Sequence, residues 1–279
     1  MADATMTAAS VLSETGHTTS SLAADLRRLG LQSGDVVLVH ASMRQIGWVA
    51  GGAAAVAGVL SEVVGANGTL VVPTQTPDNS DTSAAHLARI AGLTPEQVYE
   101  FRAAMPPFDP AATPALGMGR LAEQIRTSHG AIRSHHPQTS FAALGPLACS
   151  LMSGHRTDCH LGEHSPLARL YDAGAKILLL GVGYAVCTAF HLAEYRYQAM
   201  PPRREYGCVV IGRSGPRWHR FTDVVLDDRD FARLGADLDG TGVPVAGRVG
   251  AADCRLLRLP SAVDFAVVWL RCHRVASHP

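Results

Sequence analysis

The sequence predicts an α/β fold, a layered α/β/α sandwich with a mostly parallel central sheet and a smaller C-terminal α+β portion. Two observations support this prediction. First, short apolar runs bounded by turn residues have the length and composition of buried strands, at residues 36–40, 69–72 and 176–180. Second, segments with apolar residues at helical spacing separate these runs. Alternation of the two kinds of element is typical of α/β layer proteins.

The N-terminal half begins with a helix that Ser20 or Ser21 can cap and that Gly30 stops. After the strand at 36–40, a second helix is expected around residues 56–63, where apolar residues recur at helical spacing. An Asn-Gly turn then leads into the next strand. This part of the chain therefore reads helix, strand, helix, strand.

A polar, proline-rich segment at 77–114 follows. Within it, Pro95 at a first helical position and Glu96 in a first turn predict a helix that runs to Ala104. The segment is too long for a plain connection, so we expect a lid or a substrate loop. A helix at 118–126 and a strand at 140–144 complete the middle of the chain. 

The stretch at 176–194 is the centre of the prediction. A buried strand delivers the chain to a turn that contains Gly181 and Gly183, and a helical pattern begins near Thr188. A helix that starts at Pro166 precedes the strand. In open α/β sheets, ligands bind at turns of this kind, beyond the carboxyl ends of the strands.

After two prolines at 201–202 the pattern changes. Residues 208–221 predict a β-hairpin, and a strand at 254–259 precedes a final helix. We expect residues from about 205–279 to be the smaller sub-region of one domain at 21–279. A partly disordered tail at 1–20 is expected to precede that domain.

The composition of the chain argues against several classes of protein: nucleic-acid-binding, membrane-spanning and secreted proteins. The 24 basic and 24 acidic residues give a net charge of zero, which argues against bulk binding to nucleic acid. No apolar run reaches the length of a membrane span, and the N-terminus lacks the pattern of a signal peptide. The six cysteines show no paired spacing. We therefore expect a cytoplasmic protein with reduced thiols.

His191 and Glu194 are three residues apart, so they share one face of the predicted helix. A histidine that can take a proton, beside a carboxylate that orients it, is a general-base arrangement. Periodicity alone equally fits a structural polar contact. His40 and His136 each lie at the edge of a predicted strand. They too could have a purely structural role, as caps of turns.

Two further patterns suggest other chemistry. His160-Leu-Gly-Glu163-His164 has the H-x-x-E-H spacing of some zinc proteases, but a glycine and a helix cap place it in a loop. Cys187 lies one helical turn before His191, and such a pair could form an acyl-enzyme. A cysteine among alanine, valine and phenylalanine is more often a small core residue.

The chain contains a series of short blocks in a fixed order: Leu38-Val-His-Ala-Ser-Met-Arg-Gln-Ile-Gly47, Gly68-Thr-Leu-Val-Val-Pro-Thr74, Phe108-Asp-Pro110, Arg133-Ser-His-His-Pro-Gln-Thr-Ser-Phe-Ala-Ala-Leu-Gly145, His164-Ser-Pro-Leu167, Leu180-Gly-Val-Gly183 and Thr188-Ala-Phe-His-Leu-Ala-Glu194. Together these blocks resemble the aminoglycoside N3-acetyltransferases, a family of antibiotic acetyltransferases whose fold differs from that of the commoner N-acetyltransferases. The resemblance covers about residues 26–204, and more loosely the remainder. One departure is Cys187, where many relatives have asparagine.

The resemblance implies transfer of acetyl from acetyl-CoA, as co-substrate, to the 3-amino group of the 2-deoxystreptamine ring of an aminoglycoside. It implies direct transfer in a ternary complex, without a metal. His191 would be the base and Glu194 would orient it. The Thr188 hydroxyl, or backbone N–H groups near residues 42–47, would stabilise the oxyanion.

The resemblance also suggests residues that hold the two substrates. Small residues after the first strand and the loop at 134–140 would hold CoA. Carboxylates would pair with the ammonium groups of the antibiotic. The residues expected at CoA are His40, Ala41, Ser42, Met43, Gly47, Ser134, His136 and Ser140. The residues expected at the antibiotic are Thr74, Asp78, Asp81, Asp109, Glu123 and Glu205.

Two alternatives remain at this point. One is a zinc-dependent hydrolase that uses His160, Glu163 and His164. The other is a non-catalytic CoA-binding protein of the same fold. The partners expected for the preferred interpretation are an antibiotic and acetyl-CoA, and the protein would be a monomer or a homodimer.

Overall fold

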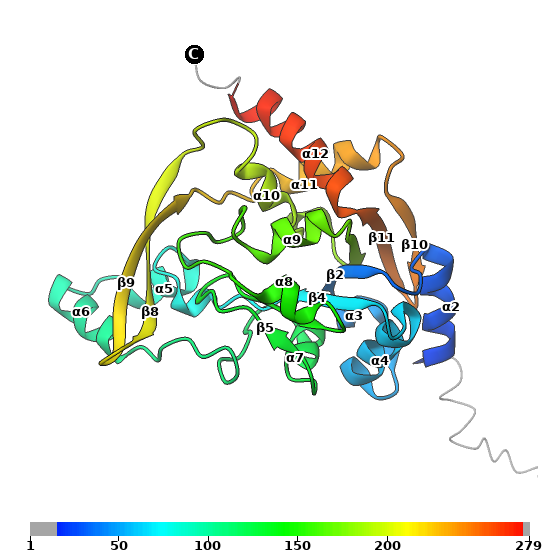
Figure 1. The fold of residues 1–279 in the computed structure, drawn as a ribbon, viewed down its shortest axis with the longest axis horizontal. Coiled ribbons are helices and arrows are strands. Elements are labelled where there is room, and N and C mark those ends of the chain that lie inside the picture. The colour runs from blue at the N-terminus through cyan, green and yellow to red at the C-terminus, as the bar shows by residue number, and fades with distance from the viewer. Residues whose placement is uncertain (1–15, 276–279) are drawn as a thin grey trace, which may run out of the picture.

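A computed structural model describes residues 16–275 of the chain (Figure 1). Its centre is a seven-stranded sheet with the order β10-β11-β7-β2-β4-β6-β5. The three middle strands are β2 (Val36–Ala41), β4 (Thr69–Pro73) and β7 (Lys176–Leu180), and β2 pairs in parallel with both of the others. The predicted α/β fold and these three strands are confirmed.

The edges of the sheet differ from the mostly parallel arrangement that we predicted. β6 (Phe141–Leu144) runs antiparallel to β4, and β5 (Ile132–Arg133) runs antiparallel to β6. On the other side, β11 (Ala252–Arg258) is antiparallel to β7 and to β10 (Val245–Val249). A turn of only two residues joins β10 to β11, and so short a connection can join only antiparallel strands.

Helices cover both faces of the sheet (Figure 1). α2 (Thr19–Leu29), α4 (Gly52–Val64) and α7 (Arg120–Arg126) share one apolar core with alternate strand residues such as Val37 and Val39. The opposite strand residues, such as Leu38, pack against the second helical layer. That layer consists of α8 (Ala148–Met152), α9 (Pro166–Asp172), α10 (Phe190–Glu194), α11 (Phe231–Asp239) and α12 (Leu259–Leu270).

The first helix starts two residues earlier than predicted. Thr18 caps it, in a reciprocal capping box with Ser21, and Gly30 ends it in the left-handed conformation. β1 (Gly16–His17) pairs with β3 (Trp48–Val49), on either side of α3 (Met43–Ile46). The expected disordered tail falls largely on residues 1–15, which lie outside the described part of the chain.

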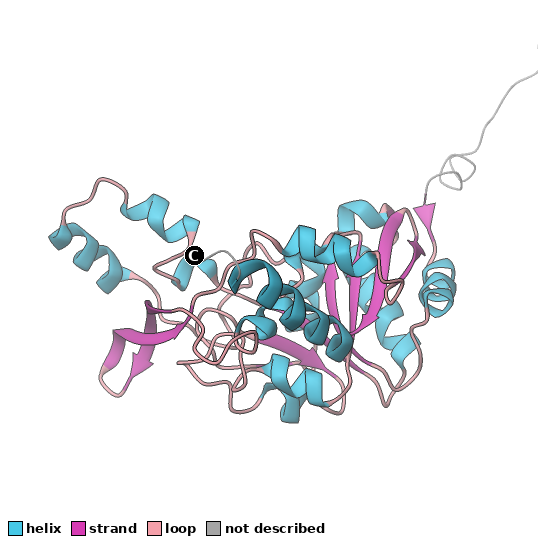
Figure 2. Cartoon of the chain, turned by 90° about the horizontal axis from the view of Figure 1, so that it is seen from above, coloured by secondary structure: helices cyan, strands magenta, loops and turns pink. Residues whose placement is uncertain are grey.

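The predicted hairpin is β8 (Arg203–Gly212) and β9 (Gly215–Val224), which projects from the body (Figure 2). The remaining C-terminal elements do not form a separate portion. β10 and β11 complete the central sheet and α12 packs on its face. Because the apolar Leu256 and Leu257 of β11 are both buried, this strand has to lie inside the main core.

The proline-rich segment lies beside the hairpin (Figure 1). It contains η1 (Pro77–Asn79), α5 (Ala84–Ile90) and α6 (Pro95–Ala104). The predicted helix at 95–104 is confirmed, with Thr94 as its cap. Asn79 joins the segment to β8, because its side chain donates to the Val209 carbonyl at 2.9 Å and accepts from the Val209 N–H at 2.7 Å. No helix in the described residues is long and apolar enough to cross a membrane.

Candidate active site

A cleft of about 340 Å³ opens beyond the carboxyl ends of β2, β4 and β7. This is the position at which α/β sheets bind ligands. Strands β2 and β4 supply part of the wall, and Val182, from the turn after β7, adds to it. The loop before α10 and the start of α11 close the cleft. The polar residues that line it are His40, Gln75, Thr188, His191 and Asp228, with Cys187 beside them.

A glycine at 181 is required where β7 delivers the chain to this cleft. Gly181 has φ of 69°, and a Cβ there would lie 2.6 Å from Cβ of Gln45. η2 (Tyr184–Val186) follows and turns the chain back into α10. The turn places Thr188 and His191 at the cleft.

His191 and Glu194 form a close pair on α10. Nδ1 of His191 lies 2.6 Å from Oε2 of Glu194. The His191 side chain is 14% exposed and that of Glu194 is 1% exposed, so the carboxylate lies behind the ring that lines the cleft. Phe231 packs against the imidazole with ring centroids 4.8 Å apart. These contacts fix the ring without covering it.

The second oxygen of Glu194 has partners that sequence reasoning missed. Oε1 accepts hydrogen bonds from the Asp227 N–H at 2.9 Å and from Nη1 of Arg274 at 2.6 Å. Arg274 also pairs with Asp230 at 2.6 Å. Burial lowers the pKa of Arg274, but the hydrogen bonds with Asp230 and Glu194 raise it above its usual value overall. Both side-chain oxygens of Glu194 are therefore held by hydrogen-bond partners.

His40 lies at the end of β2 and lines the cleft with Ala41. Its side chain is buried, and Nε2 has no hydrogen-bond partner among the described residues. Burial lowers the pKa of His40 to about 4, so the ring is neutral near pH 7. Thr188, also predicted for the site, lines the same cleft.

The other residues predicted to hold CoA lie away from the cleft lining. Ser42 continues the pairing of β2, since its N–H donates to the Leu180 carbonyl at 2.9 Å. Met43 packs on the core, and Gly47 turns the chain beside His17. Of the predicted residues after β2, only His40 and Ala41 contribute to the wall.

Ser134, His136, Ser140 and Thr74 belong to a buried polar network behind β6. The Ser140 hydroxyl donates to the Thr74 carbonyl at 2.8 Å, and Oγ of Ser134 lies 3.0 Å from Nδ1 of His155. Burial lowers the pKa of His136 well below its usual value, and the neighbouring histidines lower it further. All four side chains are buried, and none lines the cleft.

Each of the five carboxylates predicted to bind the antibiotic already has a partner, and none lines the cleft. Asp228 is the carboxylate that does line it. It is exposed and makes no ion pair with another described residue, and the sequence offers no motif that singles it out. The five partners are Arg89 for Asp78 (3.6 Å), the Gly207 N–H for Asp81 (2.8 Å), the Ala111 N–H for Asp109 (2.8 Å), Arg126 for Glu123 (2.6 Å) and Arg220 for Glu205 (2.8 Å).

The alternative of a zinc hydrolase is wrong, because the three residues do not converge. His160 is buried and bonded through both ring nitrogens, to Asp223 and Gln138. Glu163 is exposed and pairs with Arg196 at 2.6 Å, and His164 is exposed. No group of three potential metal ligands occurs among residues 16–275.

Cys187 lines the cleft but is fully buried within the core. Burial raises the pKa of its thiol to about 12. The thiolate is the nucleophilic form of cysteine, so this residue is poorly suited to form an acyl-enzyme. The interpretation of Cys187 as a core residue is favoured over the nucleophilic one.

Comparison with known proteins agrees with this geometry. The family profile described as Aminoglycoside 3-N-acetyltransferase matches residues 38–271. The SPbeta prophage-derived aminoglycoside N(3')-acetyltransferase-like protein YokD of Bacillus subtilis is 37% identical over 257 residues, covering 91% of this chain and 92% of that protein. Aminoglycoside N(3)-acetyltransferase VII of Streptomyces paromomycinus is 36% identical over 280 residues, covering 91% of each chain.

Solved structures show the same likeness. The crystal structure of YokD superposes with a TM-score of 0.87 at 35% identity, over 93% of this chain and 95% of that chain. The AAC-IIIb binary complex with CoASH gives a TM-score of 0.80 at 30% identity, over 92% of this chain and 97% of that chain. With a layered α/β fold, a cleft at the carboxyl edge of its sheet and a His–Glu pair there, the chain belongs to the aminoglycoside 3-N-acetyltransferase family of acyltransferases.

Proposed function

We propose that this protein transfers acetyl from acetyl-CoA to the 3-amino group of the 2-deoxystreptamine ring, with His191 as general base. The observation that carries the proposal is the His191–Glu194 pair at the wall of the cleft. The CoASH complex of a related protein with the same fold supports CoA as the acyl carrier.

The base has a defined task. An aminoglycoside amine is mostly an ammonium ion near pH 7, so it must lose a proton before its nitrogen can attack a thioester. The Nδ1–H of His191 donates to Glu194, which leaves the lone pair on Nε2. His191 can then take the proton, and the carboxylate stabilises the imidazolium that forms.

The acyl transfer then proceeds without a covalent enzyme intermediate. The amine nitrogen bonds to the carbonyl carbon of the thioester, and the carbonyl oxygen becomes an oxyanion. The hydroxyl of Thr188, a residue that lines the cleft, would donate a hydrogen bond to this oxyanion. When the carbonyl re-forms, the C–S bond breaks, and the proton held by His191 passes to the CoA thiolate. The nitrogen, which carries two protons after its attack, releases one of them to solvent, so that the product is a neutral amide.

His40 and Ala41 provide a contact for the acyl donor. A neutral imidazole at the wall of the cleft, with an unpartnered Nε2, can hydrogen-bond an amide or a carbonyl without adding charge. Ser42, Met43 and Gly47 shape the chain behind this wall. The buried Ser134, His136, Ser140 and Thr74 support the β4–β6 side of the sheet.

Asp228 is our candidate for contact with an ammonium group of the antibiotic. Replacing Asp228 with asparagine should raise the KM for the aminoglycoside about 2–5-fold at low salt, the effect of losing an exposed ion pair. The KM for acetyl-CoA should not change. Steady-state kinetics with each substrate varied in turn measures both constants, and high salt should reduce the difference.

Glu205→Gln is the matched control, because that carboxylate is also exposed but is paired with Arg220 on the hairpin. It should leave both KM values unchanged. An equal rise for Glu205→Gln and Asp228→Asn would contradict the placement of the antibiotic in the cleft.

Release of free thiol from acetyl-CoA in the presence of gentamicin, kanamycin or apramycin tests the activity. We expect release that depends on the antibiotic and stops after one acetyl per molecule. An antibiotic that is already acetylated on the 3-amino group should give none. CoA binding without thiol release, across a broad panel, would instead indicate the alternative of a non-catalytic CoA-binding homologue.

A further inference from the structure

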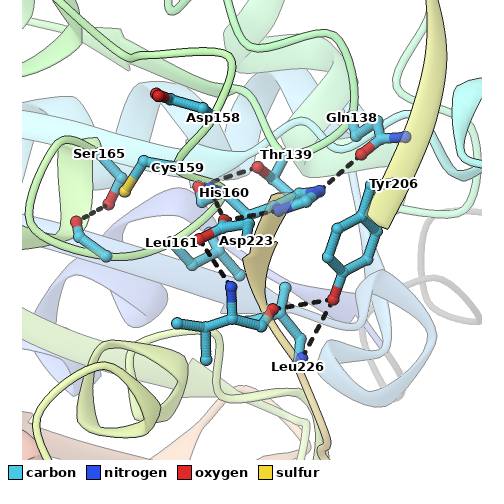
Figure 3. Close-up of polar contacts among 12 residues, drawn as sticks. Gln138, Thr139, Asp158, Cys159, His160, Leu161, Ser165, Tyr206, Asp223 and Leu226 are labelled. Atoms are coloured by element: carbon cyan, nitrogen blue, oxygen red, sulfur yellow. Dashed lines mark hydrogen bonds and ion pairs between the residues drawn. The ribbon is translucent and has the colours of Figure 1, made fainter. Parts of the chain in front are cut away.

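A second buried polar cluster lies outside the cleft, where β9 meets the body of the protein (Figure 3). We propose that Asp223, with its partners His160 and Tyr195, is a positioning residue for the catalytic pair. It would hold the segment at 224–228, which bonds Glu194 and carries Asp228 to the cleft. This inference rests on the proposed function of the cleft.

Asp223 is the centre of the cluster. Its Oδ2 accepts hydrogen bonds from the His160 N–H at 2.6 Å and from the Tyr195 hydroxyl at 2.6 Å, and it lies 2.8 Å from Nδ1 of His160. Its other oxygen accepts from the Val224 N–H at 2.8 Å. The residue is only 1% exposed. Burial would raise the pKa of Asp223, but the hydrogen bonds from His160 and Tyr195 outweigh burial and lower it.

Each ring nitrogen of His160 faces an oxygen of a neighbouring side chain. The Gln138 amide nitrogen donates to the carbonyls of Gly207 at 2.9 Å and Asn79 at 3.1 Å, so its Oε1 is the acceptor that faces Nε2 of His160 at 2.6 Å. Nδ1 of His160 faces the Asp223 carboxylate, which can only accept. Figure 3 shows the His160 ring held between these two side chains.

The contact between Asp223 and His160 joins the hairpin to the body. Asp223 is near the end of β9, whereas His160 and Gln138 come from loops of the main domain. The bond from Gln138 to Gly207 adds a second attachment on β8. A buried carboxylate with several hydrogen bonds fixes geometry tightly, because any displacement leaves a buried polar group without its partner.

A short segment of chain connects Asp223 to the cleft. The chain that leaves β9 runs from Val225, whose N–H donates to the Pro202 carbonyl at 2.8 Å, to Asp227, whose N–H donates to Oε1 of Glu194 at 2.9 Å. Asp228, the next residue, lines the cleft. Tyr195 immediately follows Glu194. Asp223 thus reaches the end of α10 in two ways. It accepts the hydrogen bond of the Tyr195 hydroxyl, and the chain that continues from β9 bonds Glu194 through the Asp227 N–H.

Asp223→Asn tests this role, with Tyr195→Phe as the milder variant in case the first does not fold. We expect Asp223→Asn to lower kcat/KM for the aminoglycoside about 10–100-fold, which is the effect of small displacements of catalytic groups. The KM for acetyl-CoA should stay unchanged. Tyr195→Phe should act in the same direction and more weakly, because it removes one of the bonds to Asp223.

Amide hydrogen exchange gives a readout that does not depend on activity. Exchange at residues 224–228 should be faster in both variants than in the unchanged protein. The matched controls are Asp264→Asn and Tyr171→Phe, which remove another tyrosine–aspartate hydrogen bond, of 2.8 Å, between α9 and α12. These controls should alter neither kinetics nor exchange at 224–228.

Two outcomes would overturn the positioning role. One is a lowered melting temperature in Asp223→Asn and Tyr195→Phe with unchanged kinetic constants, since that would make the cluster purely structural. The other is unchanged exchange at 224–228. Absence of thiol release by the unchanged protein would instead refute the proposed function, and the exchange measurement would still decide the positioning.

Discussion

Replacing His191 with alanine is expected to lower kcat by ~10²–10⁴-fold, the usual contribution of a general base. The ring lies at the cleft and contacts Phe231 and Glu194, so its loss removes the group that takes the ammonium proton. Stopped-flow or steady-state thiol release with saturating substrates measures the change. The melting temperature should also fall, because the side chain is only 14% exposed and its loss leaves Oε2 of Glu194 without this hydrogen-bond partner.

Cys187→Ala is the control for this result. It changes a neighbouring residue of the same cleft, and we expect turnover to remain within a few-fold of the unchanged protein, because the thiol is protonated in the core. Collapse of turnover in Cys187→Ala, with activity retained in His191→Ala, would indicate an acyl-cysteine route in place of direct transfer.

Glu194→Gln should lower both turnover and stability. The amide keeps the shape of the side chain but removes the charge that stabilises a protonated His191, so we expect kcat to fall by ~10²-fold or more. It also breaks the buried pair with Arg274. The free energy of unfolding should decrease by roughly 3 kcal/mol, at the low end for such a loss because Asp230 still pairs with Arg274. Kinetics and chemical denaturation measure the two effects.

Asp230→Asn separates those effects. It removes the other carboxylate that pairs with Arg274 and leaves the bond between His191 and Glu194 in place. Stability should fall while kcat stays close to that of the unchanged protein. If Asp230→Asn lost as much turnover as Glu194→Gln, the effect would belong to the Arg274 cluster as a whole and not to the orientation of His191.

The sequence predicts well those features that depend on neighbouring residues. The strands β2, β4 and β7 are apolar runs bounded by turn residues, and the pattern locates each within one residue at either end. The bounds of α6 follow from its proline, its cap and its charge pattern. The antiparallel edges of the sheet could not be predicted, because strand pairing depends on contacts between distant segments, such as β11 with β7.

The same distinction holds at the site. The spacing of His191 and Glu194 is local, and the structure places them 2.6 Å apart. Arg274 lies eighty residues after Glu194 in the sequence, so no local spacing of residues could predict their contact. The acidic residues of the proline-rich segment were predicted to bind substrate only because of their charge. One of them, Asp81, accepts from the backbone of β8 instead.

The position of the new acetyl group tests the account most directly. We would incubate the protein with acetyl-CoA and a 2-deoxystreptamine aminoglycoside, purify the product and assign it by two-dimensional NMR. The account predicts one acetyl group, bonded to the nitrogen at position 3, and no product from His191→Ala on the same time scale. An acetyl group on another amine, or a product that forms equally fast without His191, would contradict it.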